Sequence, residues 1–491
     1  MWNRLNRSMM VCQMMFGMSF YGVMAVLTRF FLEDLGYSEA DTMMVVGAFS
    51  AIGPLFAIAG GFIADRFLGA YRSLSLSFTC FGGGYALLVL GASMANVPMS
   101  LAGIALASYA RGLMFPAYSP LFKRTFKTEE DFENGYAVNY SINNIGAFIS
   151  QYAFPMIILV IGFNGSFALS SAMAILAFVL MVVNRKPLLE ISPEIDRKPV
   201  SMTNWALFVA ISIAMIGLVF FMFSNMEVGK NIVYAIGLGA IGYLVVLMFK
   251  AKKPEAMRMG TILIMVMLSI AFFVYYGQMM TSMTLVSINT MRGDLFGFIP
   301  LAPEASMAMN PMWCMVGGPL IALVFSSLEK RGIHFTTATK VGFAFILTAM
   351  AFGTLTLAVM TVGTDVVIRP EVFLVIHFFQ ALAEVIVGSM VVAFILQVTP
   401  KHIEAFSVSL FSVSIALSGV VSAVFSTSIA VEKGQEITQS IVQNLYGDYF
   451  GMLTLMAVVM VAVAFSASQL IKKMLGKEEL EPAGELQQAE S

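Results

Sequence analysis

A few ionisable residues stand inside stretches of sequence that are otherwise apolar. The clearest are Arg111, His377 and Glu384. A charge at the centre of a membrane helix costs at least about 2.5–3.5 kcal/mol, so such residues usually serve a function. His377 precedes Glu384 by two helical turns, which places both on nearly one face of a helix. These positions favour a site that handles charged solutes or protons.

Each of the three residues has a definite chemistry. Glu384 is a candidate proton-coupling residue, because a carboxyl group is neutral when protonated and charged when it binds a cation. Arg111 is a candidate ligand for a solute carboxylate, or a partner of Glu384. Packing of Arg111 against backbone carbonyls is the structural alternative. His377 is a candidate proton relay, since histidine titrates near neutral pH, or it is a satisfied core residue.

No enzyme or cofactor signature accompanies these residues. The three histidines are scattered at His334, His377 and His402. No GxxxxGK[ST] pattern occurs, so ATP is not expected to drive the protein. The cysteines Cys12 and Cys80 are too far apart in sequence from each other and from Cys314 to indicate a metal cluster. We therefore predict no enzyme, no metal site and no cofactor.

The composition indicates which environment must position these residues. Of 491 residues, 59% are hydrophobic and 12% are charged. Soluble domains have roughly 45–50% apolar and about 25% charged residues. This excludes a soluble enzyme, a disordered chain and a nucleic-acid binder, and the net charge of −1 suggests no polyanionic partner. The expected partner is the lipid bilayer.

The apolar stretches predict an all-α membrane protein with about fourteen transmembrane helices of roughly 20–25 residues. Two polar linkers divide them. We expect a six-helix bundle in residues 1–184, a linker with two inserted helices in 185–257, and a second six-helix bundle in 258–476. The acidic tail, 477–491, is expected to be disordered.

Lysine and arginine residues predict the orientation. They cluster in alternate loops, for example at Arg66 and Arg72, at Lys123 and Arg124, and at Lys472. Cytoplasmic loops carry such an excess of basic residues. Both termini are therefore expected in the cytoplasm, which requires an even number of spans.

One cytoplasmic loop carries a motif that points to a family. The stretch GGFIADRFLGAYR runs from Gly60 to Arg72. It resembles the GGxxADRxLGxYR stretch of the proton-dependent oligopeptide transporter (POT) family of the major facilitator superfamily. Glycines let two helices approach closely, and a carboxylate with nearby arginines can latch helix ends. The gating residues that follow from this reading are Gly61, Asp65, Arg66 and Arg72.

Further matches extend the resemblance over nearly the whole chain. YSINNIGA, from Tyr140 to Ala147, is similar to the family's FxxINxGA signature. Asn310 with Pro311, and Glu384 after an alanine, match its NP and GE positions. The resemblance implies that Asn143, Asn310 and Glu384 hold the amino end of a peptide-like solute. It also implies a multi-pass protein of the bacterial inner membrane, which we expect to be a monomer.

The first helix departs from the family. The family's ExxERFxYYG stretch corresponds here to QMMFGMSFYG, from Gln13 to Gly22, so both carboxylates and the arginine are absent. Phe115 stands where the family has a lysine. Tyr276 or Gly277, ahead of Gln278, replaces an acidic residue. In the family these charges serve proton coupling and hold the peptide carboxylate. Unmodified dipeptides are therefore predicted to be poor substrates.

The sequence thus predicts a secondary transporter for a small amine-bearing, peptide-like solute, coupled to protons. The alternative is an exporter of the superfamily, a proton antiporter for a drug or metabolite unrelated to peptides. The predicted substrate-binding residues are Asn143, Asn310, Glu384, Arg111, Tyr21, Tyr140, Gln278 and Phe115.

Overall fold

The computed structural model describes residues 2–400 and 403–476, and these are almost entirely helical. Helices dominate because a chain in lipid must satisfy its backbone hydrogen bonds within itself. Several helices begin at a polar side chain that accepts a backbone N–H of the first turn, namely Asn3, Ser38, Asn96, Thr128, Ser201 and Thr336. The tail predicted to be disordered, 477–491, lies outside the described residues.

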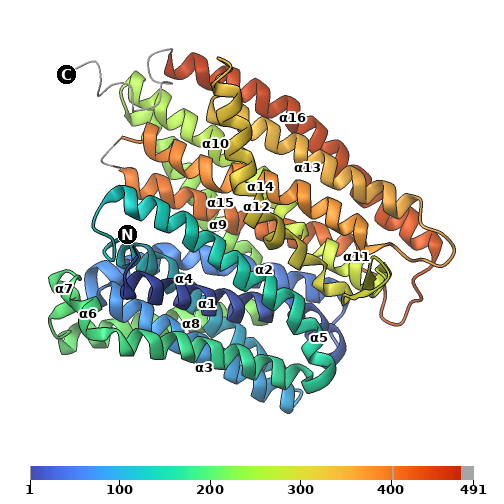
Figure 1. Cartoon of the computed structure of the whole chain (residues 1–491), viewed down its shortest axis with the longest axis horizontal. Helices are drawn as coiled ribbons and strands as arrows, with labels where there is room; N and C mark the ends of the chain where they lie inside the picture. The colour runs from blue at the N-terminus through green and yellow to red at the C-terminus, as the bar shows by residue number, and fades with distance from the viewer. Residues whose placement is uncertain (1, 401–402, 477–491) are drawn as a thin grey trace.

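The N-terminal half forms one bundle. Its elements are α1 (Arg4–Arg29), η1 (Phe30–Asp34), α2 (Glu39–Ile63), η2 (Ala64–Leu68), α3 (Ala70–Ser93), α4 (Val97–Lys123) and α5 (Glu129–Val183). Within it α1 packs on α5, α3 packs on α4 and α5, and α2 packs on α4. Figure 1 shows this bundle beside the C-terminal one, with the helices of both running in the same general direction.

The C-terminal half forms the second bundle. Its elements are α10 (Lys253–Gln278), α11 (Ser282–Thr290), β1 (Asp294–Leu295), β2 (Ile299–Pro300), η3 (Pro303–Ala308), α12 (Met309–Glu329), α13 (Thr337–Met360), α14 (Pro370–Val398), α15 (Glu404–Ser426), η5 (Thr427–Ile429), η6 (Ile441–Tyr446) and α16 (Gly447–Leu475). The two short strands pair antiparallel, with Leu295 opposite Ile299. Here α13 packs on α14 and α16, and α12 packs on α14.

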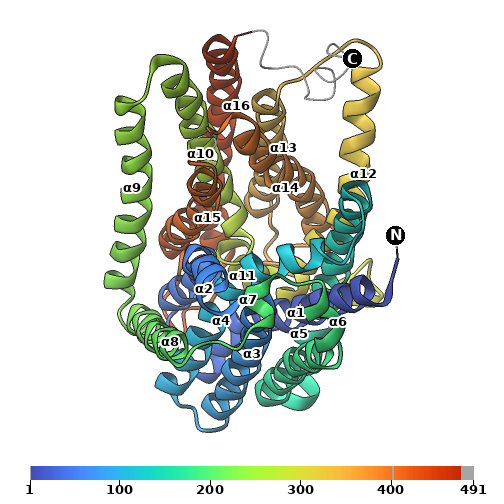
Figure 2. The same ribbon diagram turned by 90° about the vertical axis from the view of Figure 1, so that its left-hand side faces the viewer.

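A linker with two long helices joins the bundles. It contains α6 (Arg185–Glu190), α7 (Glu194–Arg197), α8 (Met202–Ser224) and α9 (Met226–Lys250). The inserted pair predicted within 185–257 is α8 and α9. Figure 2 shows α8 beside the N-terminal helices and α9 reaching from there to the C-terminal helices.

Of the described helices, 12 are long and apolar enough to cross a membrane. The protein is therefore a multi-pass membrane protein, and the all-α fold class is confirmed. Two features bear on the predicted fourteen spans, which stay a prediction. The 27-residue α4 is not among the 12. The 55-residue α5 contains Gly162 at φ 68°, a left-handed conformation that interrupts the helix.

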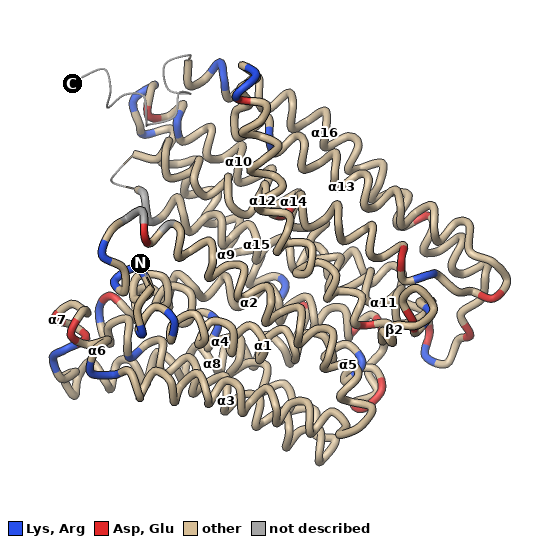
Figure 3. Tube along the Cα trace, viewed as in Figure 1, with Lys and Arg blue, Asp and Glu red and all other residues tan. Residues whose placement is uncertain are grey.

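Charged residues divide the ends of the bundles into two faces. Figure 3 shows lysine and arginine gathered mainly where α5 begins and α16 ends, and acidic residues more frequent near α11 and β2. We call these ends the basic face and the acidic face. The basic face includes Arg66, Lys123 and Lys330, and the acidic face includes Glu39 and Glu304.

Candidate functional site

A cavity of about 800 Å³ lies between the two bundles, in the half of the protein nearer the basic face. It is lined by α5 from the N-terminal bundle and by α12 and α14 from the C-terminal one. Tyr140, Cys314 and Glu384 contribute to its wall. Two of the predicted site residues, Tyr140 and Glu384, therefore face the same space.

Glu384 lies in a small polar cluster. The side-chain amide of Asn310 donates to Glu384 Oε2 at 3.1 Å. The Cys314 thiol contacts the same oxygen at 3.6 Å, and Tyr276 also lies beside the carboxylate. The predicted pairing of Asn310 with Glu384 is thus present in the structure. Cys314 was not predicted, although it follows Asn310 by one helical turn and the spacing alone places both on one face.

Asn143 lies against α1 instead of contacting Glu384. Its Oδ1 accepts from Gln13 Nε2 at 3.2 Å. The contact requires a glycine on α1, because a Cβ at Gly17 would lie 2.8 Å from the Asn143 Oδ1. Gln13 and Gly17 occupy the positions where the family resemblance implies a glutamate and an arginine. An amide pair here replaces that charged arrangement.

Arg111 is held without an acidic partner. Its Nη1 donates to the Ser50 carbonyl at 2.9 Å, and its guanidinium carbon lies 4.4 Å from the centre of the Phe20 ring. Its Nε is buried and has no hydrogen-bond partner. Gly53 makes space for the Arg111 side chain, because a Cβ at position 53 would lie 2.5 Å from the Arg111 Cδ. The structural alternative from sequence, packing against a carbonyl, is therefore also present.

The two charges stand on opposite bundles. Arg111 is on α4 and Glu384 is on α14, and neither forms an ion pair among the described residues. Tyr21 lies within electrostatic range of both. The predicted direct pairing of Arg111 with Glu384 is thus not formed in this conformation, and Arg111 is not among the residues that line the cavity at Glu384.

Aromatic side chains occupy two positions where the family resemblance implies charges. Phe115 is 44% exposed and meets the Phe16 ring edge-on at 6.0 Å between ring centres. These two positions are where the resemblance implies a lysine and a carboxylate. Phe16 also packs on Phe20 at 5.9 Å and on Phe81 at 5.2 Å. These rings, which we call the aromatic wall, stand where the resemblance implies charged groups for proton coupling and for the peptide carboxylate.

Two predicted residues lie away from the cavity. Gln278 is fully buried, donates to Ser422 Oγ at 2.9 Å and accepts from the Tyr449 hydroxyl at 2.6 Å, so it holds α10 to α15 and α16. His377 is buried at 1% exposure, and its Nδ1 has no hydrogen-bond partner. It does not line the cavity that Glu384 faces. Their roles as ligand and proton relay stay predictions.

The Gly60–Arg72 motif builds a joint at the basic face. A Cβ at Gly60 would lie 2.0 Å from the Gly112 carbonyl oxygen, whereas Gly61 has ordinary contacts. Asp65 and Arg66 are exposed, and neither forms an ion pair among the described residues. Arg72 donates to the carbonyls of Leu68, Ile195 and Lys198. The motif therefore binds the linker after α5.

A carboxylate outside the motif completes that joint. Asp196 is fully buried and accepts the Tyr71 N–H at 2.9 Å, at the start of α3. Burial raises the pKa of Asp196, and the bond from Tyr71 opposes that change. Gly69 has φ 83°, and a Cβ there would collide with the Asp196 carboxylate. The sequence offered no signal for Asp196, because its partner α3 lies far away in the chain.

The acidic face is closed by contacts between the bundles. Arg29 Nη1 of α1 pairs with Glu304 Oε1 of η3 at 2.9 Å, and Arg29 also pairs with Glu33 at 2.8 Å. Glu39 of α2 accepts from Asn289 at 3.1 Å and from the Val431 N–H at 2.8 Å. These contacts separate the cavity from the acidic face. The cavity lies in the half of the protein nearer the basic face.

Comparison with known proteins shows which sequences this chain resembles. The model of the Major Facilitator Superfamily matches residues 9–339. Dipeptide and tripeptide permease B of Salmonella typhimurium is 23% identical over 449 residues, covering 90% of this chain and 91% of the permease. Dipeptide and tripeptide permease A of Pectobacterium carotovorum is 25% identical over 414 residues, covering 84% and 80%.

Solved structures share the fold. A bacterial homologue of the human drug peptide transporters PepT1 and PepT2 superposes with TM-score 0.84 at 20% identity, over 96% of this chain and 98% of that one. A POT family transporter in complex with 5-aminolevulinic acid superposes with TM-score 0.80 at 18% identity, over 95% and 96%.

Proposed function

The chain belongs to the Major Facilitator Superfamily, and we propose that it carries a small, amine-bearing, peptide-like solute across the membrane by alternating access. The similar proteins named dipeptide and tripeptide permeases support this solute class. Two helical bundles around a central site are the usual architecture of a secondary transporter.

The separation of Arg111 from Glu384 carries the proposal. A negative group and a positive group on opposite bundles, both without ionic partners among the described residues, are complementary to a zwitterion. The ammonium group of the solute binds Glu384 beside Asn310. Its carboxylate is drawn to Arg111, because burying a single charge without a counter-ion is costly. Tyr21 and Tyr140 contribute polar contacts along the way.

The aromatic wall further restricts the class of solutes that fits the site. Phe115 has no charge to offer a carboxylate, so the acid group must reach Arg111, which precedes Phe115 by one helical turn of α4. The exposed ring of Phe115, backed by Phe16, suits an apolar segment between the two charged ends. This arrangement favours amino acids and peptide-like metabolites over dialanine. One solved relative in complex with 5-aminolevulinic acid carries such a ligand.

Glu384 also supplies the proton coupling in this proposal. A carboxylate that binds a solute ammonium cannot hold a proton at the same oxygen, so solute and proton compete. The first-helix positions of the family's carboxylates hold Gln13 and Phe16. Coupling therefore depends on one acid in the cavity.

The orientation and assembly belong to the same proposal. We assign the basic face to the cytoplasm of a bacterial inner membrane, since basic loops stay inside. Both termini are then cytoplasmic, the closed acidic face is periplasmic, and the cavity lies toward the cytoplasm. Each copy acts as a monomer, because one chain contains both bundles and the whole cavity.

A ligand panel tests the proposal. Purified protein is screened by thermal shift with 5-aminolevulinic acid, dialanine, and an alkylamine of matched length that lacks a carboxylate. A ligand of the native state raises the melting temperature by mass action. We expect the largest shift with 5-aminolevulinic acid, and a smaller one in Arg111→Gln protein. An equal shift with the alkylamine, unchanged in Arg111→Gln, would overturn the zwitterion site.

The aromatic wall also favours a second candidate, a proton antiporter for a hydrophobic cation. Such a solute needs Glu384 and the rings of Phe16 and Phe115, but not Arg111. The two candidates differ in proteoliposomes. In both, an outward proton gradient drives the solute inward in exchange for protons, but Arg111→Gln lowers transport of the zwitterion in the first and leaves transport of the cation unchanged in the second.

A further inference from the structure

The inserted helix α8 is anchored to the N-terminal bundle. The Tyr109 hydroxyl of α4 and the Ser212 hydroxyl of α8 lie 2.5 Å apart and form a buried hydrogen bond. Phe208 packs with Leu113 of α4 in the same small apolar cluster. A polar bond between helices in lipid fixes their register. One side of the inserted pair therefore moves with the N-terminal bundle.

The second inserted helix, α9, is anchored to the C-terminal bundle. Its buried residues Gly229, Val233 and Gly237 recur every four positions and form one face. A Cβ at Gly237 would lie 2.4 Å from the side chain of Leu417 on α15, so the helices touch closely. Near its other end Tyr243 meets Phe406 edge-on at 5.2 Å. Figure 2 shows α9 reaching across to this bundle.

The two anchors lie on either side of a tight seam between the bundles. There α2 crosses α15 through small residues. A Cβ at Gly47 would meet the Cβ of Ala423 at 2.4 Å, and a Cβ at Gly419 would meet that of Ala51 at 2.8 Å. The seam lies in the halves of α2 and α15 nearer the acidic face. Opening that face requires α2 and α15 to separate.

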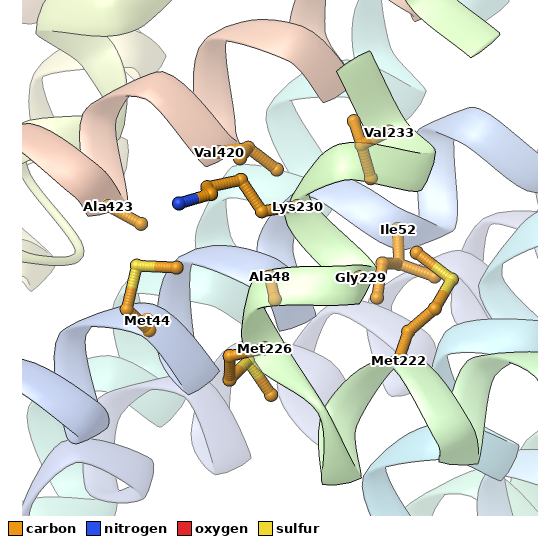
Figure 4. A pocket seen from close by; sticks show the side chains of 10 residues that line it. All are labelled: Met44, Ala48, Ile52, Met222, Met226, Gly229, Lys230, Val233, Val420 and Ala423. Atoms are coloured by element: carbon orange, nitrogen blue, oxygen red, sulfur yellow. The ribbon is translucent and has the colours of Figure 1, made fainter. Parts of the chain in front are cut away.

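The turn between α8 and α9 covers this seam. A gap of about 10 Å³, roughly the space of one water molecule, is lined by Met44 and Ala48 of α2, by Met222 and Met226 of the inserted pair, and by Val420 and Ala423 of α15. Figure 4 shows these side chains around one space, with Lys230 of α9 extending toward Ala423. Methionine is flexible, so it fills a joint that must change shape.

We propose that the α8–α9 pair is a strap that holds the acidic face closed. With α8 fixed to α4 and α9 fixed to α15, separation of α2 from α15 strips α9 from one of its two supports. The lost contacts oppose the outward-open state and favour the state seen here. The strap thus sets the balance between the two access states. This role rests on alternating access and not on the identity of the solute.

Spin labels measure the balance directly. Met94→Cys, on the N-terminal bundle, and Asp365→Cys, on the C-terminal bundle, place labels in turns at the acidic face, where Met94 is 64% exposed. The three native cysteines are replaced by alanine in every protein compared. Pulsed electron–electron distance distributions then give the fraction of molecules in which the acidic face is open.

Two variants weaken the same contact in opposite ways. Gly237→Leu pushes α9 off α15, and Leu417→Ala removes the side chain that it rests on. Gly239→Leu is the matched control, because nothing lies within 4 Å of a Cβ there. We expect the open fraction to rise by about threefold or more in both variants, and to stay at the parent value in the control.

The outcomes decide the proposal. An open fraction in Leu417→Ala equal to that of the parent would overturn the strap, and this variant suffices if Gly237→Leu does not fold. A rise in Gly239→Leu as large as in Gly237→Leu would also overturn it, since the effect would then come from bulk on α9 and not from its contact with α15.

Discussion

Replacement of Glu384 by glutamine isolates the charge from the shape of the site. The amide keeps an oxygen that accepts from Asn310, at 3.1 Å in the wild type, and it keeps the volume that Cys314 packs against. What is lost is the charge that meets the solute ammonium. A hydrogen bond to a charged group is worth about 1.5–3 kcal/mol, which corresponds to about 10- to 100-fold in affinity.

The assay is uptake into proteoliposomes with and without an imposed pH gradient. We expect Glu384→Gln to lose stimulation by the gradient and to bind the solute about 10- to 100-fold more weakly. Thermal stability should not fall, because Glu384 forms no ion pair with Arg111 in this conformation. Glu371→Gln, the same change at the start of the same helix, should behave like the wild type.

Two results would refute the reasoning. Gradient-stimulated uptake that persists in Glu384→Gln would show that another group carries the proton. A large fall in melting temperature with unchanged coupling would show that Glu384 serves only to neutralise Arg111.

Further predictions concern the opposite charge, the closed face and the topology. Arg111→Gln should weaken binding of 5-aminolevulinic acid by about tenfold or more and leave a carboxylate-free amine unaffected, which calorimetry would reveal; equal losses would contradict its role. Arg29→Glu should raise labelling of a cysteine introduced at the acidic face, and adding Glu304→Arg should reverse part of the effect, because the pair at 2.9 Å is restored with exchanged signs while the pair with Glu33 is not; failure of that partial rescue argues against an ionic latch. A reporter at the C-terminus should read cytoplasmic, and a periplasmic signal would contradict the orientation.

The general architecture was predictable from sequence because hydrophobic length and basic loops are strong signals in membrane proteins. The two bundles and the inserted pair follow from them. The number of membrane-spanning helices was harder to test. The polar residues of α4 lower its mean hydropathy, so it is not clearly apolar enough to span a membrane. In addition, α5 continues through Gly162 with only a local break. A left-handed glycine is not distinguishable from an ordinary one by composition.

The site was predictable where helical spacing or a motif carried the information. Asn310 and Glu384 lie together, and Tyr140 lines their cavity. Gln278 does not line this cavity. Its side-chain amide lies at the end of α10 and needs hydrogen-bond partners, which Ser422 and Tyr449 on other helices provide. Such partners lie far away in the chain, so no local pattern predicts which face of α10 the side chain takes.

Two of the charges that the family resemblance implies, at positions 16 and 115, are both replaced by aromatic rings. An isolated carboxylate at position 16, without the lysine that the resemblance implies at position 115, would be a buried charge without a partner, which is strongly destabilising. Here both positions hold phenylalanine, and the rings contact each other. Arg111 and Glu384 have no such compensation among the described residues.

This asymmetry bears on how coupling works. In the proposed mechanism, either a proton or the ammonium group of the solute neutralises Glu384, and the solute also brings a carboxylate to Arg111. By linkage, the factor by which a proton weakens binding of the ammonium equals the factor by which the ammonium weakens binding of the proton. Under this proposal, one acid is sufficient for exchange. Because Gln13 and Phe16 carry no charge, neither of these first-helix positions offers the proton a second acid besides Glu384.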